Sequence, residues 1–350
     1  MRTAHELMAS FGERTGITGA RPQRRYLWTD AFAVCNFLGL GQADLARSTI
    51  RHVHHELGRH RADDPRRGWI SGLSEIDGEA HPTLGGLRIG KPLPERGPAD
   101  QIDEQLEWER DGQYFHYLTK WMHALDQAAR ITRDDRLATW ARELADTAHR
   151  RFVHGPHASR RMSWKMSIDL MRPQVPSMGH HDPLDGYVTC LQLRATRGRG
   201  PDLDQAIEDF RAMIDPRTLA TTDPLGLGGL LVDGARLAQL DADGELRDAI
   251  FVAARVGLAR YLQRSDLARP AQHRLAFREL GLAVGLAAAE RVAADGFTQS
   301  LRVREAILSF WSDPAHCRSA AYTEHQDIND VMLATSLAPT AFLVLGSPLG

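Results

Sequence analysis

Residues 113–152 read QYFHYLTKWMHALDQAARITRDDRLATWARELADTAHRRF, and this stretch decides the fold class. Its first half carries apolar and aromatic residues three and four positions apart, such as Tyr117 and Trp121. After the short gap 132–134, the same spacing returns in a segment that includes Leu144 and has charged residues on its opposite face. Because this spacing is that of an amphipathic helix, the stretch predicts two antiparallel helices joined by a tight turn.

The rest of the chain repeats this pattern. Almost no segment alternates apolar and polar residues as a half-buried strand does, so the sequence predicts an all-α protein. Gaps inside a pair of helices are short, whereas gaps between pairs are often longer, which is typical of helical hairpins placed side by side. The expected helices lie near 3–12, 29–40, 42–58, 113–130, 135–152, 183–197, 202–214, 225–240, 243–263, 273–291, 297–311 and 327–345.

The two helices of a pair differ in character. First members such as 31–40 (AFAVCNFLGL) are nearly apolar, whereas second members are amphipathic. Since a helix that is apolar all round must be buried on every side, we expect six inner helices ringed by six outer ones. This is an (α/α)6 toroid of six helical hairpins in a single domain, 1–350. Two long excursions, 59–112 and 153–182, interrupt the pairs, and we expect short strands in the first. Loops longer than ~12–15 residues usually serve a site.

Composition narrows the function. The 350 residues include 43 Lys+Arg and 45 Asp+Glu, a net charge of −2 that argues against a nucleic-acid partner. No stretch is long and apolar enough to cross a membrane, and the first 25 residues contain no apolar signal-peptide core, so we expect a cytoplasmic monomer or homodimer. Only three of the 43 basic residues are lysines, Lys91, Lys120 and Lys165. A GC-rich genome explains such a bias, so the arginines alone say little about the substrate.

Polar residues gather just before each apolar helix. In a toroid the inner helices run parallel, so these segments would meet on one rim; they are 26–30, 111–116, 179–186, 222–226, 273–279 and 322–330. Aromatic rings stack on the apolar faces of sugars, and carboxylates, imidazoles and guanidinium groups bind hydroxyls, so the mixture suits a carbohydrate substrate. Several members, including Asp30, Asp182 and Asp327, are also residue types expected as helix N-caps.

Three members of this set invite a specific interpretation. Glu279 stands inside an apolar helix, and a buried glutamate is costly unless it is paired or functional; it is either catalytic or a structural partner of Arg274 or Arg278. Lys165, in an excursion leading to the rim, is either a substrate contact or a solvent-exposed lysine. The adjacent pair His180-His181 does not suit a metal because the two rings point in different directions, so no metal and no cofactor are expected.

The chain resembles the six-hairpin glycosidase superfamily. The resemblance rests on the alternation of short and long gaps between helices and on the rim segments Trp28-Thr29-Asp30, His180-His181-Asp182 and Glu324-His325. This superfamily includes unsaturated glucuronyl hydrolases, and N-acylglucosamine and cellobiose 2-epimerases share its barrel. The resemblance covers nearly the whole chain at the level of architecture and implies rim carboxylates as acid and base, with inversion if the two lie ~6.5–9.5 Å apart.

On this resemblance the principal catalytic candidates are Glu279 and Glu324, followed by Asp30 and Asp182. The expected substrate-binding residues are Trp28, Tyr114, His116, Trp164, Lys165, His181, Asp185, Arg274, Arg278, His325 and Asp327. If the arginines point inward, the substrate is anionic, such as a uronic acid or a sugar phosphate.

Two alternatives remain open. A sugar 2-epimerase or isomerase would move a proton at carbon 2, and His116, His181, His273 and His325 could supply the acid and the base because histidine titrates near neutral pH. A toroid that only binds carbohydrate, without chemistry, is the third reading, since a fold does not fix a function.

Overall fold

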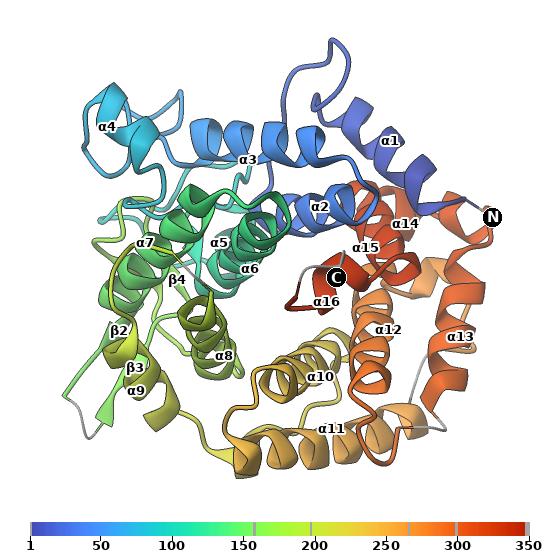
Figure 1. Cartoon of the computed structure of the whole chain (residues 1–350). Coiled ribbons are helices and arrows are strands. Elements are labelled where there is room, and N and C mark those ends of the chain that lie inside the picture. Colours follow the sequence, from blue (N-terminus) through green and yellow to red (C-terminus); the bar gives the residue numbers. More distant parts are fainter. Residues whose placement is uncertain (1, 157–158, 197, 265–266, 298–299, 347–350) are drawn as a thin grey trace.

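The computed structural model describes residues 2–156, 159–196, 198–264, 267–297 and 300–346. Most of these residues are helical, and the strands among them are two or three residues long, which confirms the all-α class. A ring of helices forms the centre (Figure 1). Its members are α2 (Leu27–Gly39), α6 (Phe115–Thr132), α8 (Asp182–Ala195), α10 (Pro224–Gln239), α12 (Ala276–Arg291) and α15 (Gln326–Leu337).

Each helix of the ring packs against the next, and α15 packs against α2, so the ring is closed. A second set covers it from outside; this set contains α3 (Ala43–Leu57), α7 (Asp135–Phe152), α9 (Asp204–Ala212), α11 (Gly244–Arg264), α13 (Leu301–Trp311) and α1 (Ala4–Arg14). Five outer helices follow their inner partners along the chain, whereas α15 is covered by α1 from the opposite end of the chain.

Small residues let the inner helices approach closely. A Cβ atom added to Gly228 of α10 would lie 2.2 Å from the carbonyl oxygen of Gly281, and one added to Gly285 of α12 would lie 2.5 Å from the Cα atom of Gly228. Neither backbone could accommodate the extra atom without moving apart. The glycines in these two apolar stretches therefore fix the distance between α10 and α12 rather than supplying flexibility.

The C-terminal segment closes one end of the ring, and here the expected helix 327–345 is wrong. The helix α15 ends at Leu337, because the residue before Pro339 is disfavoured in helical conformation, and a separate short helix, α16 (Thr340–Leu343), lies inside the ring (Figure 1). Side chains on α6 bind its free carbonyls: His123 contacts the oxygen of Phe342 at 2.9 Å and Gln127 donates to that of Ala341 at 2.6 Å. The opposite end of the ring, where the inner helices begin, is not covered by this segment.

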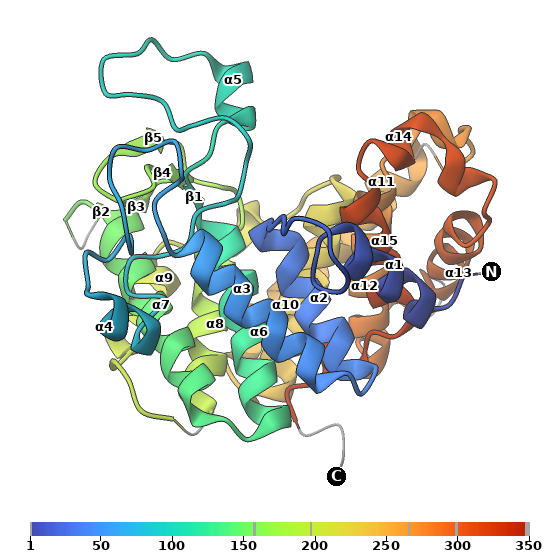
Figure 2. The same cartoon turned by 90° about the horizontal axis from the view of Figure 1, so that it is seen from above.

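The two excursions rise above that opposite end. Figure 2 shows α5 (Glu104–Glu109) and the small strands standing clear of the helical ring. The strands mostly belong to the second excursion: β1 (Gln113–Tyr114), β4 (Lys165–Met166) and β5 (Pro173–Val175) form one antiparallel sheet, and β2 (Val153–His154) pairs with β3 (Arg161–Met162). Within its described residues the first excursion contributes α4 (Glu75–Ala80), α5 and isolated bridges such as Arg59 with Trp69, rather than the expected strands.

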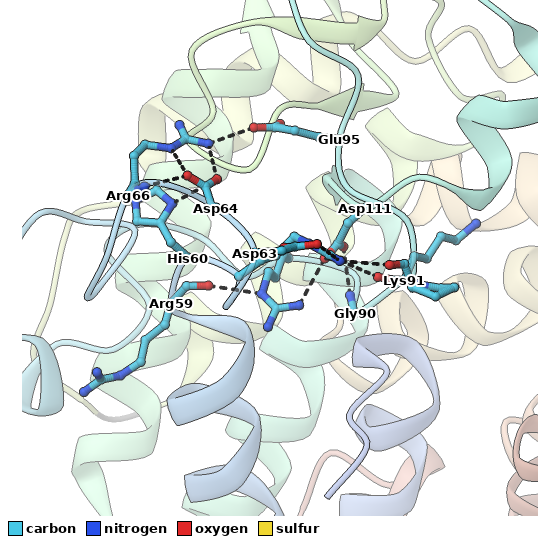
Figure 3. Close-up of polar contacts among 12 residues, drawn as sticks. Arg59, His60, Asp63, Asp64, Arg66, Gly90, Lys91, Glu95 and Asp111 are labelled. Carbon is cyan, nitrogen blue, oxygen red and sulfur yellow. Dashed lines mark hydrogen bonds and ion pairs between the residues drawn. The ribbon is translucent and has the colours of Figure 1, made fainter.

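Arginines fix the first excursion in place (Figure 3). The guanidinium of Arg66 binds Asp64, Glu95 and Asp169, which ties this excursion to the second one. The buried carboxylate of Asp111 accepts hydrogen bonds from the backbone N–H of Gly90 at 3.0 Å and from Arg88 at 3.0 Å. This network holds Lys91, the residue after Gly90, in a defined position above the ring.

Candidate functional site

Two carboxylates lie one turn apart where α8 begins. Asp182 and Asp185 are both buried, with 6% of each residue exposed. Each carries one carboxylate oxygen, Oδ2 of Asp182 and Oδ1 of Asp185, that is buried and has no hydrogen-bond partner among the described residues. Buried polar atoms of folded proteins are usually hydrogen-bonded. Other described residues also carry such atoms, but here two of them belong to carboxylates on one helical turn, which makes the pair a candidate site.

Asp182 is held in its neutral form. The ring of His116 lies beside it, with Nδ1 3.9 Å from Oδ1, and the N-cap residue of α8 is His181 rather than Asp182. Burial, reinforced by the neighbouring charge of Asp185, raises the pKa of Asp182 to about 8. A carboxyl with this pKa is protonated at neutral pH and can donate a proton. The N-cap alternative therefore does not describe this residue.

Asp185 is held in its charged form. Burial acts to raise its pKa, but the positive charges of Lys120 and Arg236 outweigh burial, and the pKa lies below its ordinary value. The Oδ2 atom accepts hydrogen bonds from Lys120 Nζ at 2.7 Å and from Thr119 Oγ1 at 2.5 Å. Two neighbouring carboxyl groups thus have pKa values that differ in opposite directions from the usual value, as acid and base pairs in active sites do.

Two histidines beside these carboxylates are neutral and carry their protons on different atoms. Burial lowers the pKa of His116 to about 4 and that of His181 to about 4. The indole N–H of Trp164 donates to Nδ1 of His116 at 3.2 Å, so the proton of His116 is on Nε2. The Nε2 of His181 lies 2.8 Å from the carbonyl oxygen of Leu219 and must donate to it, which leaves Nδ1 as an acceptor.

An aromatic wall stands next to His116. The ring centroids of Tyr114 and Trp164 are 5.5 Å apart, and Tyr114 lies 5.3 Å from His116 and 5.2 Å from Tyr117. Trp108 of α5 packs edge-on against Trp164 with half of its own surface exposed. The β1–β4 pairing and the excursion that carries α5 bring these rings together. Tyr114 is buried, whereas Trp108 and Trp164 keep exposed surface that suits stacking on a sugar ring.

A cavity of about 1050 Å³ lies on the other side of the tyrosines, at the starts of α2 and α15. Tyr26 lines it and its hydroxyl lies 2.7 Å from that of Tyr117. The arginines that line the cavity bind carboxylates or backbone carbonyls; they are Arg14, Arg24, Arg25, Arg61 and Arg88. Within the described residues Lys91 has no ion-pair partner, and its ammonium group lies 5.7 Å from the centroid of the Tyr114 ring.

Glu279, a principal catalytic candidate, lies elsewhere in a saturated cluster. Arg274 donates to Oε1 at 2.9 Å and to Oε2 at 2.6 Å, and the indole of Trp311 on the outer helix α13 donates to Oε2 at 2.7 Å. This is the geometry of the structural Arg–Glu alternative. The catalytic role of Glu279 stays a prediction, because both of its carboxylate oxygens already accept hydrogen bonds from protein groups.

The other two carboxylate candidates, Glu324 and Asp30, line the cavity of about 1050 Å³. Glu324 is exposed and lines the cavity together with Asp30 and His325. Asp30 is buried, accepts from Arg25 at 3.2 Å and from the backbone of Tyr26 at 3.0 Å, and burial raises its pKa to about 6. The cavity thus brings these three candidates to one side of the tyrosines, apart from Asp182 and Asp185.

Other expected substrate contacts occupy structural positions. Trp28 is buried and packs on Phe32 inside α2. Asp327 pairs with Arg14, and Arg278 pairs with Asp223, the capping residue of α10. Lys165 is fully buried rather than solvent-exposed.

The ammonium group of the buried Lys165 donates hydrogen bonds to the carbonyl oxygens of Glu107 at 2.6 Å and Arg110 at 2.9 Å, which anchors α5. Lys165 therefore supports the aromatic wall from behind.

Sequence reasoning missed several residues that complete the site. Lys120 and Arg236 keep Asp185 charged, and Lys91 faces the cavity. A signal for the lysines was present in the composition, because all three lysines of the chain lie around the start of α6. Lys91 and Lys165 flank the Tyr114 ring at 5.7 and 5.5 Å, and Lys120 lies one turn after His116.

Comparison with known protein families, with curated proteins and with solved structures finds no match to this chain. In the described part of the chain no helix is both long and apolar enough to span a membrane. The same residues include no group of three or more His, Cys, Asp or Glu side chains arranged to hold a metal ion.

Proposed function

We propose that this protein is a carbohydrate-active enzyme, a glycoside hydrolase built on an (α/α)6 toroid, with Asp182 as general acid and Asp185 as its ionised partner. The observation that carries the proposal is the pair of buried carboxyl groups on one turn of α8 with opposite protonation states. The closed ring and its outer helices support the toroid class.

The proposed chemistry uses the two groups in turn. The O–H of Asp182 gives its proton to the glycosidic oxygen as the bond between this oxygen and the anomeric carbon breaks. Residues three apart on a helix are ~5–6 Å apart at Cβ, which suits the closer spacing of retaining enzymes. Asp185, held as an anion by Lys120 and Thr119, would therefore form a bond from its carboxylate oxygen to the anomeric carbon as the glycosidic bond breaks. Water would then displace Asp185 from that carbon and give its proton to the ionised Asp182. The partly exposed rings of Trp164 and Trp108 would hold the sugar ring beside these groups.

The substrate is best matched by an anionic oligosaccharide, such as one that contains a uronic acid. Lys91 lines the cavity without an ion pair to any described carboxylate, although the charges of Glu109 and Asp111 act on it from a distance, and it stands over the ring of Tyr114. A carboxylate of the substrate would supply the charge partner that this half-buried ammonium group lacks.

The experiment that tests the hydrolase proposal uses neutral and uronic-acid oligosaccharides in water labelled with ¹⁸O. A shortened product that carries one solvent oxygen is expected from the wild-type chain, and no such product from Asp182→Asn. An unchanged rate for Asp182→Asn would overturn the assignment of the acid. Ligand binding without any product would favour the carbohydrate-binding alternative.

The two neutral histidines favour one second candidate, a sugar 2-epimerase. His181 has a free acceptor nitrogen and His116 a donor nitrogen, which are the two roles needed to remove a proton at carbon 2 and return one to the opposite face. In deuterated water, carbon-bound deuterium in a product of unchanged length, lost in His181→Ala, would support the epimerase and exclude hydrolysis as the main reaction.

A further inference from the structure

A second cavity, of about 660 Å³, lies on the outer wall of the molecule along α3, next to the residues at the end of α3 that border the first cavity. Its lining comes from α3, α4, α7 and the segments beside them, which adjoin one another in Figure 1. The walls are apolar and aromatic, with Ile50, Trp69, Pro82, Leu137 and Trp140 contributing. This volume and this lining are those of small-molecule sites, which are apolar with a few placed polar groups.

His54 is the first of these polar groups. It lines the cavity, is 4% exposed, and its Nε2 accepts a hydrogen bond from the indole N–H of Trp121 at 3.0 Å. Because burial keeps the ring neutral, its single proton is on Nδ1. No hydrogen bond joins this Nδ1 to any other described residue. A buried ring therefore presents an unused donor at the wall of an aromatic cavity, where its plane meets that of Trp140 edge-on at 5.1 Å.

Arg51 is the second polar group. The cavity is bordered by three arginines, of which Arg47 is paired with Asp44 at 2.9 Å and Arg136 with Asp134 at 2.8 Å. Arg51 forms no ion pair with a described carboxylate, and it donates one long hydrogen bond, to the hydroxyl of Ser48 at 3.5 Å. Because Arg51 and His54 are three residues apart on α3, they are neighbours on one face of the helix.

We propose that this cavity binds a planar aromatic acid whose ring also carries a hydrogen-bond acceptor. The ring lies among the side chains of Trp69, Trp140 and Leu137, the acceptor takes the Nδ1–H of His54, and the carboxylate pairs with Arg51. Cβ atoms three residues apart in a helix are separated by ~5–6 Å, so we place the acceptor and the acid on opposite sides of one six-membered ring. This site is separate from the proposed sugar site and does not depend on it.

The probe that meets these conditions is quinoline-4-carboxylate, whose ring nitrogen and carboxylate lie across one ring. Binding to the full chain is measured by calorimetry, together with the ¹⁵N indole resonances of Trp121 and Trp140. We expect saturable binding that shifts both resonances. Naphthalene-1-carboxylate, which lacks the acceptor, and quinoline, which lacks the acid, should each bind about tenfold more weakly or worse, as expected for the loss of one hydrogen bond to a charged or buried group.

Variants on the exposed face of α3 separate this site from non-specific binding. Arg51→Met should weaken quinoline-4-carboxylate by about tenfold and leave the weak binding of quinoline unchanged. Arg47→Met, one turn earlier and already neutralised by Asp44, is the matched control and should have little effect. No saturable binding, equal loss in both variants, or indole resonances that do not move would each overturn the proposal.

Discussion

Two buried carboxylates at the starts of inner helices, Glu279 and Asp182, are alike in exposure and opposite in bonding. Glu279 is 5% exposed and both of its oxygens are bound by Arg274, with Trp311 adding a further donor. Asp182 is 6% exposed, yet none of the described groups donates to its side chain, and the ring of His116 stays 3.9 Å away. Burial of an acid is therefore not in itself a sign of catalysis.

Glu279 and Asp182 differ in how the cost of burying a carboxyl group is met. The donors around Glu279 offset the cost of burying its charge, so the cluster ties α12 to α13 and has no capacity left for a substrate. Asp182 avoids that cost by keeping its proton, which leaves a reactive group at the rim. The backbone of Gly179 packs closely against this carboxyl group, because a Cβ atom there would collide with Oδ2 of Asp182.

The largest expected effect is on turnover by Asp182→Asn. An amide cannot give a proton to the leaving oxygen, so kcat should fall by ~10²–10⁴. Stability should not fall with it, because the native side chain is already neutral at pH 7. An increase in the free energy of unfolding on the order of a few kcal/mol is expected, since the unfolded chain no longer gains from ionising this group. Urea denaturation and product mass spectrometry measure the two effects separately.

Glu279→Gln should show the reverse pattern. The change leaves the buried guanidinium of Arg274 without a charge partner, which costs ~3–5 kcal/mol in the free energy of unfolding. Turnover by the folded fraction should change little. Glu290→Gln, at the exposed end of the same helix and 3.8 Å from Arg304, is the matched control and should cost less than ~0.5 kcal/mol. Loss of turnover in Glu279→Gln at unchanged stability would return the catalytic role to Glu279.

The same pair shows what the sequence can and cannot predict. Helical spacing in 113–152 predicts α6 and α7 because the pattern is local. The expected helix 327–345 was wrong because the apolar spacing was given more weight than Pro339, which disfavours helix in the residue before it. Whether a buried acid is paired depends on partners far along the chain. Lys120 is 65 residues from Asp185, and Trp311 is 32 residues from Glu279, so neither pairing could be derived from local pattern.

A third, intermediate effect is the dependence on pH. Below the ordinary pKa of 3.8, Asp182 is protonated in both the folded and the unfolded chain. Between that value and about 8 only the unfolded chain loses the proton, so the contribution of Asp182 to the free energy of unfolding should fall as the pH rises through this window. Asp182→Asn should remove this slope.

Activity of the wild-type chain should decline as the pH rises above about 8, when the acid itself ionises. A pH–rate profile of kcat over the neutral and alkaline range measures this limb. A flat profile through pH 8, or a stability slope that persists in Asp182→Asn, would contradict the assignment of the raised pKa to this carboxyl.

The smallest expected effect concerns Lys91, which we propose binds the charged group of the substrate. Among the described residues Lys91 forms no ion pair, whereas its cavity neighbour Arg24 pairs with Asp327 at 3.3 Å; the ammonium group of Lys91 lies over the face of Tyr114 and is influenced by Glu109 and Asp111 from a distance. Lys91→Met keeps the aliphatic stem and removes the charge, so KM for uronic-acid oligosaccharides should rise by about five- to tenfold. KM for neutral ones should stay unchanged, and Arg24→Met should affect neither. An equal rise for both kinds of substrate would mean that Lys91 packs against the sugar rather than binding its charge, and the substrate would then be neutral even with Asp182 in its proposed role.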